Sequence, residues 1–395
     1  MCRRTSTGRV TGSVPASNKK EVIMWTISTN KSWDHLAQSF DWVRDMALTP
    51  QDPQHHAEGD VATHTRMVLE ALCADAAYIE LTEQDREILW AAALLHDVEK
   101  RSTTVTEPDG RISSPGHARK GALTARQILY GEIPTPFAIR QQVTALVRYH
   151  GFPLWALERP DPVKELVKVS QEIDTRLLAM LARADVLGRI CADKDEMLYR
   201  IGCFEALCQE QQCWGAARPF ATPHARMHYL LHENTHPDYV PFEQPVSEVI
   251  LMSGLPGAGK DTFIRRHYPN LPVVSLDGLR EEMGVSPTDA TGNGQVIQAA
   301  KERARVFLRK GTGFVWNATN VTRQMRMQLL ELFFTYKAQV RIVYVEVPYR
   351  QLFRQNSNRE AVVPALVLEK LAAKLEVPAA WEAHEVTWIA ADPAF

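Results

Sequence analysis

The chain has 395 residues, a formal net charge of −2 and 45% hydrophobic residues, which suits two globular domains with a connector and a tail. No apolar run approaches the roughly 18 residues of a membrane-spanning helix, so we expect no membrane partner. The six cysteines lack the spacing of a disulfide framework, which favours a reducing, cytoplasmic location.

The amino-terminal half has a helical pattern. Residues 1–23 are rich in Ser, Thr and basic side chains and predict a disordered tail, or an over-long start upstream of Met24, rather than a transit-like segment. Apolar residues recur at spacings of three and four up to about residue 207, which predicts an all-α domain over 24–207. Residues 208–245 lose this pattern and gather proline and histidine, so we expect a connector with one short helix.

The carboxy-terminal part, 246–395, alternates strand-like and helical segments. The strand-like segments are SEVILMSG, LPVVSL, GFVWNAT and VRIVYVEV. This alternation predicts a parallel sheet flanked by helices. The expected fold class is therefore α plus α/β, in two domains.

Ionisable residues fall on the apolar faces of four predicted helices. They are His64, His96, His150 and Asp185. One buried histidine is usually a satisfied core residue, but four such residues, with Asp97 beside His96, are explained most simply by a shared cation. Imidazole and carboxylate ligands without paired cysteines suit a catalytic divalent metal such as Mn, Fe, Ni, Co, Zn or Mg. Such an ion activates water and polarises phosphoryl oxygens, which predicts phosphoester hydrolysis.

The same residues carry a family resemblance. The segments HAEGDVATHT, AALLHDVEK, PGHARKGA, RYH and ARADVLGR, in this order, resemble the HD superfamily, and most of all the HD domain of bacterial CCA-adding tRNA nucleotidyltransferases. The resemblance covers roughly residues 36 to 195. It implies 2′,3′-cyclic phosphodiesterase and 2′-phosphatase activity with a divalent transition metal such as Mn²⁺.

The resemblance also implies roles for single residues. A first metal would be held by His64, His96, Asp97 and Asp185. His117 and His150 would hold a second metal or contact the substrate phosphate, and the sequence does not decide between these roles. Lys100, one turn after His96, either faces the same pocket or is an exposed helix lysine. The upstream His55, His56 and Glu58 either support the ligands or form a polar start to the helix.

The segment GLPGAGKDT follows a predicted strand and precedes a predicted helix, as a phosphate-binding P-loop does. We expect it to bind ATP or another NTP with Mg²⁺. The expected contact residues are Gly254, Pro256, Gly257, Gly259, Lys260, Asp261 and Thr262. Asp261 stands where P-loops usually have Ser or Thr, so either Asp261 or Thr262 would serve the metal.

Phosphoryl transfer also needs a base and cations for the transferred group. After the second predicted strand, SLDGLRE offers Asp277 and, one turn later, Arg280. A helix cap is the alternative explanation for an aspartate at a strand end. Further on, FRQNSNREAVVP places Arg354 and Arg359 in a polar stretch that predicts either a mobile lid or a solvated helix.

In this order, the P-loop, DGLR, WNATN, NSNR and VVP resemble the 5′-OH polynucleotide kinase family, including the phage enzyme, over nearly all of 247–380. The resemblance implies that Asp277 is the general base, Arg280 clamps a phosphate of the acceptor strand and Arg359 is the lid arginine. It leaves open the roles of Asn317, Thr319 and Asn320, which stand where related kinases carry an acidic turn.

The whole chain resembles the bacterial bifunctional HD-Pnk RNA end-healing enzymes. This implies phosphorylation of 5′-OH ends and removal of 2′,3′-cyclic phosphate ends, on RNA such as tRNA fragments, in cooperation with an RNA ligase. DNA stays open as a substrate, as do the HD metal, the preferred NTP and the oligomeric state. The alternatives are a small-molecule nucleotidase and kinase fusion, and a nucleotide-gated HD regulator.

Overall fold

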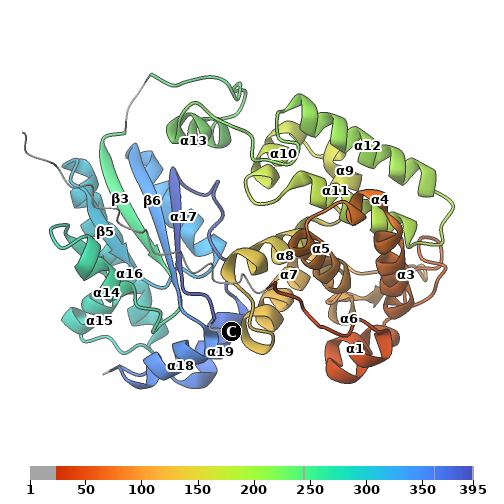
Figure 1. Cartoon of the computed structure of the whole chain (residues 1–395). Helices are drawn as coiled ribbons and strands as arrows, with labels where there is room; N and C mark the ends of the chain where they lie inside the picture. Colours follow the sequence, from red (N-terminus) through yellow and green to blue (C-terminus); the bar gives the residue numbers. More distant parts are fainter. Residues whose placement is uncertain (1–23, 243–244, 360, 394–395) are drawn as a thin grey trace, which may run out of the picture.

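The computed structural model describes residues 24–242, 245–359 and 361–393. Figure 1 shows a helical half and a half built around one sheet, which confirms the predicted fold class. The tail predicted over 1–23 lies outside the described residues. None of the helices in the described part is long and apolar enough to cross a membrane.

The first half is a bundle of helices around one apolar core. Its helices are α1 (Trp33–Ser39), α2 (Asp41–Arg44), α3 (Val61–Ala74), α4 (Ala76–Ile79), α5 (Glu83–Leu95), α6 (Lys100–Thr103), α7 (His117–Gln127), α8 (Phe137–Tyr149), α9 (Phe152–Trp155), α10 (Pro162–Ser170), α11 (Thr175–Leu187) and α12 (Lys194–Glu210). Shorter helical turns are η1 (Asp45–Leu48), η2 (Ile128–Glu132) and η3 (Ala156–Glu158), and a small hairpin pairs β1 (Val105–Thr106) with β2 (Ile112–Ser113). The sequence pattern had not indicated this hairpin.

Helix α5 is the centre of this bundle. Every residue from Ile88 to Leu95 is buried, and α5 packs against α3, α8 and α11. Its amino terminus is fixed by Thr82, whose hydroxyl accepts the backbone N–H of Asp85 at 3.1 Å. Helix α3 is capped in the same way by Asp60, which accepts the N–H of Thr63 at 2.8 Å. Because α5 is buried among α3, α8 and α11, its carboxyl-terminal end lies deep inside the domain.

The second half is a parallel five-stranded sheet in the order β4-β5-β3-β6-β7. Its elements are β3 (Ser247–Ser253), α14 (Lys260–His267), β4 (Val273–Ser275), α15 (Leu276–Met283), α16 (Ala290–Arg309), β5 (Phe314–Asn317), α17 (Arg323–Thr335), β6 (Ala338–Glu346), α18 (Tyr349–Ser357), α19 (Ala365–Ala373) and β7 (Glu385–Ala390). The four predicted strands are confirmed. The edge strand β7 was missed; its residues are only partly buried, as expected for an edge strand.

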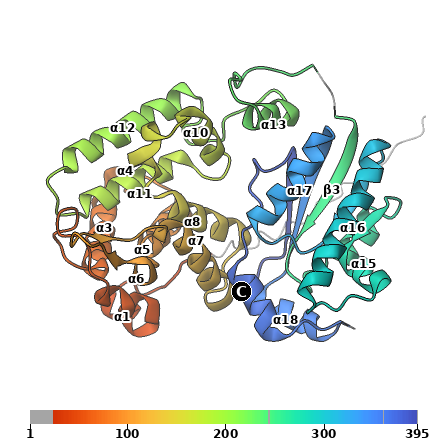
Figure 2. The ribbon, with the colours of Figure 1, turned by 180° about the vertical axis from the view of Figure 1, so that it is seen from behind.

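Both faces of the sheet are covered by helices. In the central strand β3, Val249 and Leu251 face α16 and α17, whereas Ile250 and Met252 face α14, α18 and α19. Burial on both faces explains why the central strands read as unbroken apolar runs. Figure 2 shows the molecule from behind, with α16 and α17 over the face of the sheet to which Val249 and Leu251 belong.

The connector holds the predicted short helix, α13 (Pro223–Leu231). Helix α12 ends at Glu210, and Cys208 and Cys213 are fully buried in the helical core, so packing of the first domain continues past residue 207. Helix α13 lies against the second domain, because Arg226 donates to the carbonyls of Ala383 at 2.9 Å and His384 at 3.0 Å.

The His384 imidazole makes the stability of this region dependent on pH. Its Nδ1 accepts the N–H of Val340 at 3.1 Å, so the ring is neutral when bonded. Burial, with His224 and Arg226 nearby, lowers the pKa of His384 from 6.5 to about 4. The unfolded chain therefore binds the extra proton between these pH values, and stability falls as the pH drops through this window.

We predict that His384→Asn, whose amide oxygen accepts the same hydrogen bond without titrating, flattens this pH dependence. The wild-type free energy of unfolding should fall by about 2–3 kcal/mol more than that of the variant between pH 7 and pH 4. Urea unfolding of both proteins across this range measures the difference. Parallel profiles for the two proteins would contradict the assignment.

Candidate metal centre and nucleotide site

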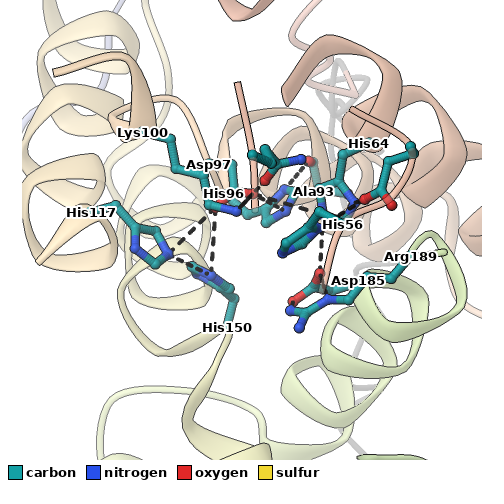
Figure 3. Close-up of polar contacts among 12 residues, drawn as sticks. His56, His64, Ala93, His96, Asp97, Lys100, His117, His150, Asp185 and Arg189 are labelled. Carbon is teal, nitrogen blue, oxygen red and sulfur yellow. Dashed lines mark hydrogen bonds and ion pairs between the residues drawn. The ribbon is translucent and has the colours of Figure 1, made fainter. Parts of the chain in front are cut away.

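Six ionisable side chains of the helical domain point toward one another (Figure 3). They are His64 in α3, His96 and Asp97 directly after α5, His117 at the start of α7, His150 directly after α8, and Asp185 in α11. All except His117 are at most 5% exposed. Residues spread over more than 120 positions of sequence thus meet at one buried point, since His64 Nε2 lies 3.1 Å from Asp185 Oδ1 across a separation of 121 residues.

Backbone carbonyls orient three of the imidazoles. The Nδ1 pairs are His96 with Ala93 O at 2.7 Å, His117 with Ser114 O at 2.8 Å, and His150 with Val147 O at 2.9 Å. A carbonyl only accepts, so Nδ1 carries the hydrogen and Nε2 carries the lone pair. Each Nε2 therefore faces the cluster in the form that binds metal, which is the arrangement seen for metal-bound histidines.

The two oxygens of Asp97 face different imidazoles. Oδ2 lies 3.2 Å from His96 Nε2 and 3.8 Å from His64 Nε2. Oδ1 lies 3.4 Å from His117 Nε2 and 3.9 Å from His150 Nε2. The cluster accordingly divides into two possible ligand groups, each with its ligand atoms within 4.8 Å of one another. They are His64, His96 and Asp185, and Asp97, His117 and His150.

Two buried polar atoms of the cluster support a bound cation. Among the described residues, His96 Nε2 and Asp97 Oδ1 have no hydrogen-bond partner. Leaving such atoms unpaired costs free energy that a metal ion would recover. Burial raises the pKa of Asp97, but His96, Lys100 and His117 hold it well below its usual range. Burial, with His96 and His117, lowers the pKa of His150 to about 3, so this ring is neutral at pH 7.

Lys100, the first residue of α6, faces the cluster. Its ammonium lies 2.8 Å from Asp97 Oδ2 and donates to Gln51 Oε1 at 2.5 Å. The lysine is 9% exposed, so it is not the exposed helix lysine of the alternative interpretation. Gln51, which fixes the Lys100 side chain, had no signal in the sequence pattern.

The sequence left open the roles of His56 and Glu58, which lie beside the cluster. Glu58 Oε1 lies 2.8 Å from Nδ1 of both His56 and His64, and Glu58 Oε2 accepts the N–H of Ile190 at 2.9 Å. Burial raises the pKa of Glu58, but its contacts with His56, His64 and the N–H of Ile190 hold it below its usual value. Glu58 thus faces His64 Nδ1 as a charged neighbour, without the hydrogen-bond geometry that the carbonyls give the other rings. His55 points elsewhere, with its imidazole 52% exposed and 3.8 Å from Asp193.

Arg189 was also missed. Its guanidinium binds Asp185 through two contacts, at 2.6 Å to Oδ2 and 3.1 Å to Oδ1. The pair holds the carboxylate in one orientation and, although burial raises the pKa of Asp185, keeps it well below its usual range. The sequence signal available was that Arg189 follows Asp185 by four residues, but Arg189 lies beyond the last residue of α11.

We predict that Glu58→Gln weakens metal binding at this cluster by about 10- to 100-fold, because an amide cannot replace the charge that holds His64 Nδ1. Competition with a chelator, followed by metal analysis of the dialysed protein, measures the affinity. Glu165→Gln, an exposed glutamate of α10, is the matched control and should bind metal as the wild type does. Equal affinities for all three proteins would refute a supporting role for Glu58.

The second site is the turn between β3 and α14. Gly254 has φ 143°, and a Cβ atom there would lie 2.4 Å from the carbonyl oxygen of Val345, so only glycine fits. Pro256, Gly257 and Gly259 complete the turn before Lys260, whose ammonium donates to the carbonyls of Gly254 at 2.8 Å and Leu255 at 2.9 Å. Burial lowers the pKa of Lys260 to about 8.

The residue in the Ser/Thr position of the loop is held by the sheet. Asp261 Oδ1 accepts from Asn317 Nδ2 at 2.6 Å, at the carboxyl end of β5. The Thr262 hydroxyl instead accepts from Arg265 of its own helix at 3.3 Å. Of the two candidates for Mg²⁺, Asp261 is therefore the one beside the ends of the strands, where ligands bind in open α/β sheets.

The remaining residues of the Asn-rich turn support the backbone. Asn320 is buried with φ 45° and donates to Met252 O at 2.7 Å, while its carbonyl accepts the hydroxyl of Ser253 at 3.0 Å. The carbonyl of Thr319 accepts the N–H of Gly254 at 2.9 Å. These contacts tie the turn after β5 to the base of the P-loop, so the backbone of Thr319 and the side chain of Asn320 fix the loop.

Asp277 is the second residue of α15 and is not its cap, because Ser275 accepts the N–H of Gly278 at 3.2 Å instead. The Asp277 carboxylate is 83% exposed and pairs with the Arg280 guanidinium. Arg280 is held from the other side by Asn293 Oδ1 at 2.6 Å. A charged carboxylate is thus presented to solvent near Lys260, whose pKa it raises.

Arg359 follows α18 in a loop that Asn356 closes. Asn356 is buried, donates to Val363 O at 2.7 Å and accepts the N–H of Val363 at 3.2 Å. The end of α18 lies over the P-loop, since a Cβ on Gly257 would be 3.3 Å from the Asn356 nitrogen. Arg359 Nη1 is buried without a hydrogen-bond partner among the described residues, and its charge lowers the pKa of Lys260. Arg354 is exposed.

Comparisons with known proteins agree with these two sites. Residues 61–189 match the family model of the HD domain, and residues 249–378 match that of an AAA domain. The chain thus combines a segment that matches an HD domain with a segment that matches an AAA domain, and these matches support a metal in the first and an NTP with Mg²⁺ in the second.

Curated relatives match the HD part. The chain is 37% identical over 118 residues to the "Multifunctional CCA protein" of Halorhodospira halophila and 34% identical over 116 residues to that of Methylococcus capsulatus. These matches cover 30% and 29% of this chain, and 26% and 24% of those proteins, so the chain spans about a quarter of the relatives' length. Among solved structures, a sugar kinase of Janibacter sp. HTCC2649 is 18% identical with a TM-score of 0.28, over 37% of this chain and 86% of that one.

Proposed function

We propose that this chain heals RNA ends, phosphorylating 5′-hydroxyl ends in its P-loop domain and removing 2′,3′-cyclic phosphate or 2′-phosphate ends in its HD domain. The observation that supports the proposal is that one chain holds two groups of residues suited to handling phosphate. One is the buried imidazole and carboxylate cluster around Asp97, and the other is the P-loop with Asp277 and Arg359 beside Lys260.

In the HD domain, the ligands would be His64, His96, Asp97 and Asp185 for one divalent ion, and Asp97, His117 and His150 for a second. When bound, such an ion supplies an activated water and polarises a phosphoryl oxygen. Each oxygen of Asp97 faces one pair of imidazoles, which favours a shared carboxylate between two ions. Lys100 places a positive charge beside Asp97, where it neutralises a substrate phosphate.

In the P-loop domain, the backbone N–H groups of the loop and Lys260 hold the phosphates of ATP or another NTP. Asp261, which Asn317 orients, would hold Mg²⁺. Asp277 accepts the proton of the 5′-hydroxyl while the hydroxyl oxygen forms a bond to the γ-phosphorus. The bond between the γ-phosphorus and the β-phosphate oxygen breaks, which releases the nucleoside diphosphate. Arg359 neutralises charge on the transferred group, and Arg280 binds a phosphate of the acceptor strand.

RNA is the proposed substrate because the HD segment resembles CCA-adding tRNA nucleotidyltransferases, which supports an RNA end in this pocket, with tRNA fragments among the candidates. The exposure of Asp277 supports a macromolecular acceptor, because the end of a long strand can reach the carboxylate from solvent. Cleavage that leaves a 5′-hydroxyl and a 2′,3′-cyclic phosphate produces both substrates together, and an RNA ligase would use the healed ends.

We predict that the two reactions separate by mutation. Given an RNA with 5′-OH and 2′,3′-cyclic phosphate ends, NTP and Mn²⁺ with Mg²⁺, the wild type should transfer labelled phosphate to the 5′ end and open or remove the cyclic phosphate. His96→Ala should abolish only the second reaction, and Lys260→Ala only the first. Gel analysis of the labelled RNA and of the released phosphate measures both.

Asp277→Asn tests the base and should lower the kinase rate by about 10²–10⁴-fold with little change in NTP binding. Arg354→Gln, an exposed arginine of α18, is the matched control and should keep both activities. Mononucleosides phosphorylated faster than RNA ends would refute the polynucleotide assignment. Loss of both reactions in either His96→Ala or Lys260→Ala would refute two independent sites.

A further inference from the structure

A cavity of about 460 Å³ lies between the two domains, and neither the proposed metal ligands nor the P-loop residues line it. One side is formed by α7 and α8 of the helical domain, and the other by residues 375–380 and Trp388 of the P-loop domain. Figures 1 and 2 both show α7 and α8 between the rest of the helical bundle and the second domain. Ligand pockets commonly occur at domain interfaces and have volumes of roughly 300–1,000 Å³.

The cavity is lined by one face of α7 and one face of α8. On α7 the lining residues are Arg119, Ala122, Leu123 and Arg126, and on α8 they are Phe137, Ala138, Gln141, Thr144, Ala145 and Arg148. These spacings of three and four define one face of each helix. The core of the helical domain instead receives Val143, Leu146 and Val147 of α8.

The charges that line the cavity are unbalanced. It is lined by four arginines and two glutamates, and both glutamates are already bonded. Glu172 accepts from Tyr149, Trp381 and Arg323 at 2.8, 2.6 and 3.4 Å. Glu376 accepts the N–H of Arg323 at 2.9 Å. Both carboxylates therefore already accept hydrogen bonds from residues of the interface.

Arg126 is a buried guanidinium without an ionic partner in the described part of the chain. It is 8% exposed and donates from Nη2 to neutral groups only, the amide of Gln141 and the hydroxyl of Thr144 at 3.0 Å. Its Nη1 is buried and has no hydrogen-bond partner among the described residues. Burial, with Arg140 nearby, lowers the pKa of Arg126 to about 10, so the group stays charged at pH 7. Leaving this charge unpaired is costly.

The remaining walls suit a flat apolar group. Most of the other lining side chains are apolar, and Trp388 presents an indole whose Nε1 is already bonded to Pro378 O at 2.9 Å. Arg148, on α8, makes no hydrogen bond or ion pair with any described residue and offers a second guanidinium. A simple phosphate ion would leave most of the volume and the apolar walls unused.

We propose that this interdomain cavity binds a mononucleotide, with its phosphate on Arg126 and Arg148 and its base against the apolar wall near Trp388. Guanidinium groups bind phosphate through paired charge-assisted hydrogen bonds, and aromatic side chains stack on bases. The ligand would contact both domains at once and so stabilise the interface. The cavity is separate from the P-loop, which holds β- and γ-phosphates rather than a single phosphate.

The test uses adenosine 5′-monophosphate, which lacks the β- and γ-phosphates on which P-loop binding depends. Calorimetric titration of the full chain should show one site for this nucleotide, and Lys260→Ala should keep it with unchanged affinity. Arg126→Gln should weaken the binding at least tenfold through loss of a charged hydrogen-bond donor. Ala138→Trp should abolish it by filling the cavity, and Arg354→Gln should bind as the wild type does.

If Arg126→Gln does not fold, the loss of nucleotide binding in Ala138→Trp tests the proposal instead. The melting temperature shows whether each variant is folded. Binding that is lost in Lys260→Ala but kept in folded Ala138→Trp would overturn the proposal and place the nucleotide at the P-loop. Inorganic phosphate that binds as tightly as the nucleotide would overturn the role of the base. Absence of binding to the wild type would overturn the proposal altogether.

Discussion

The cost of burying charge is the constraint on which the helical domain depends. His64, His96, Asp97 and Asp185 are at most 2% exposed, in the middle of a core of Leu, Ala and Val side chains. Such groups are stable there only when they are paired, bonded to backbone or bound to a cation. The backbone carbonyls, Glu58 and Arg189 supply the outer partners, and the inward-facing atoms are left for a metal.

The same constraint fixes the two domains against each other. Arg140 of α8 is buried and pairs with Glu346 at the end of β6, whose other oxygen accepts the hydroxyl of Tyr344 at 2.6 Å. Removing one member of a buried pair typically costs about 3–5 kcal/mol, so the Arg140–Glu346 pair sets a specific domain arrangement rather than a sliding contact.

The sequence predicted those features of the fold and the site that local periodicity indicates. The helical pattern shows which face of a helix is apolar, so an ionisable residue on that face, such as His64 or Asp185, can be found without coordinates. Glu58 and Arg189 lie outside the helices whose faces they serve, and Asn356 acts by closing a loop, so no periodic signal marks their contacts. Strand β7 and the interdomain cavity depend on which elements become neighbours, and that information is absent from any single segment.

The exposure of the cluster indicates how a substrate reaches it. Five of its six residues are closed off from solvent, whereas the His117 side chain is 25% exposed. His117 is also the first residue of α7, where the helix dipole favours an anion. A terminal phosphate would therefore approach from the side of His117 and meet Asp97 and Lys100 next, which leaves His64 and Asp185 as the deepest ligands. Under the proposed function, this order would separate the residues that hold the metal from His117, which would be the first to meet the RNA end.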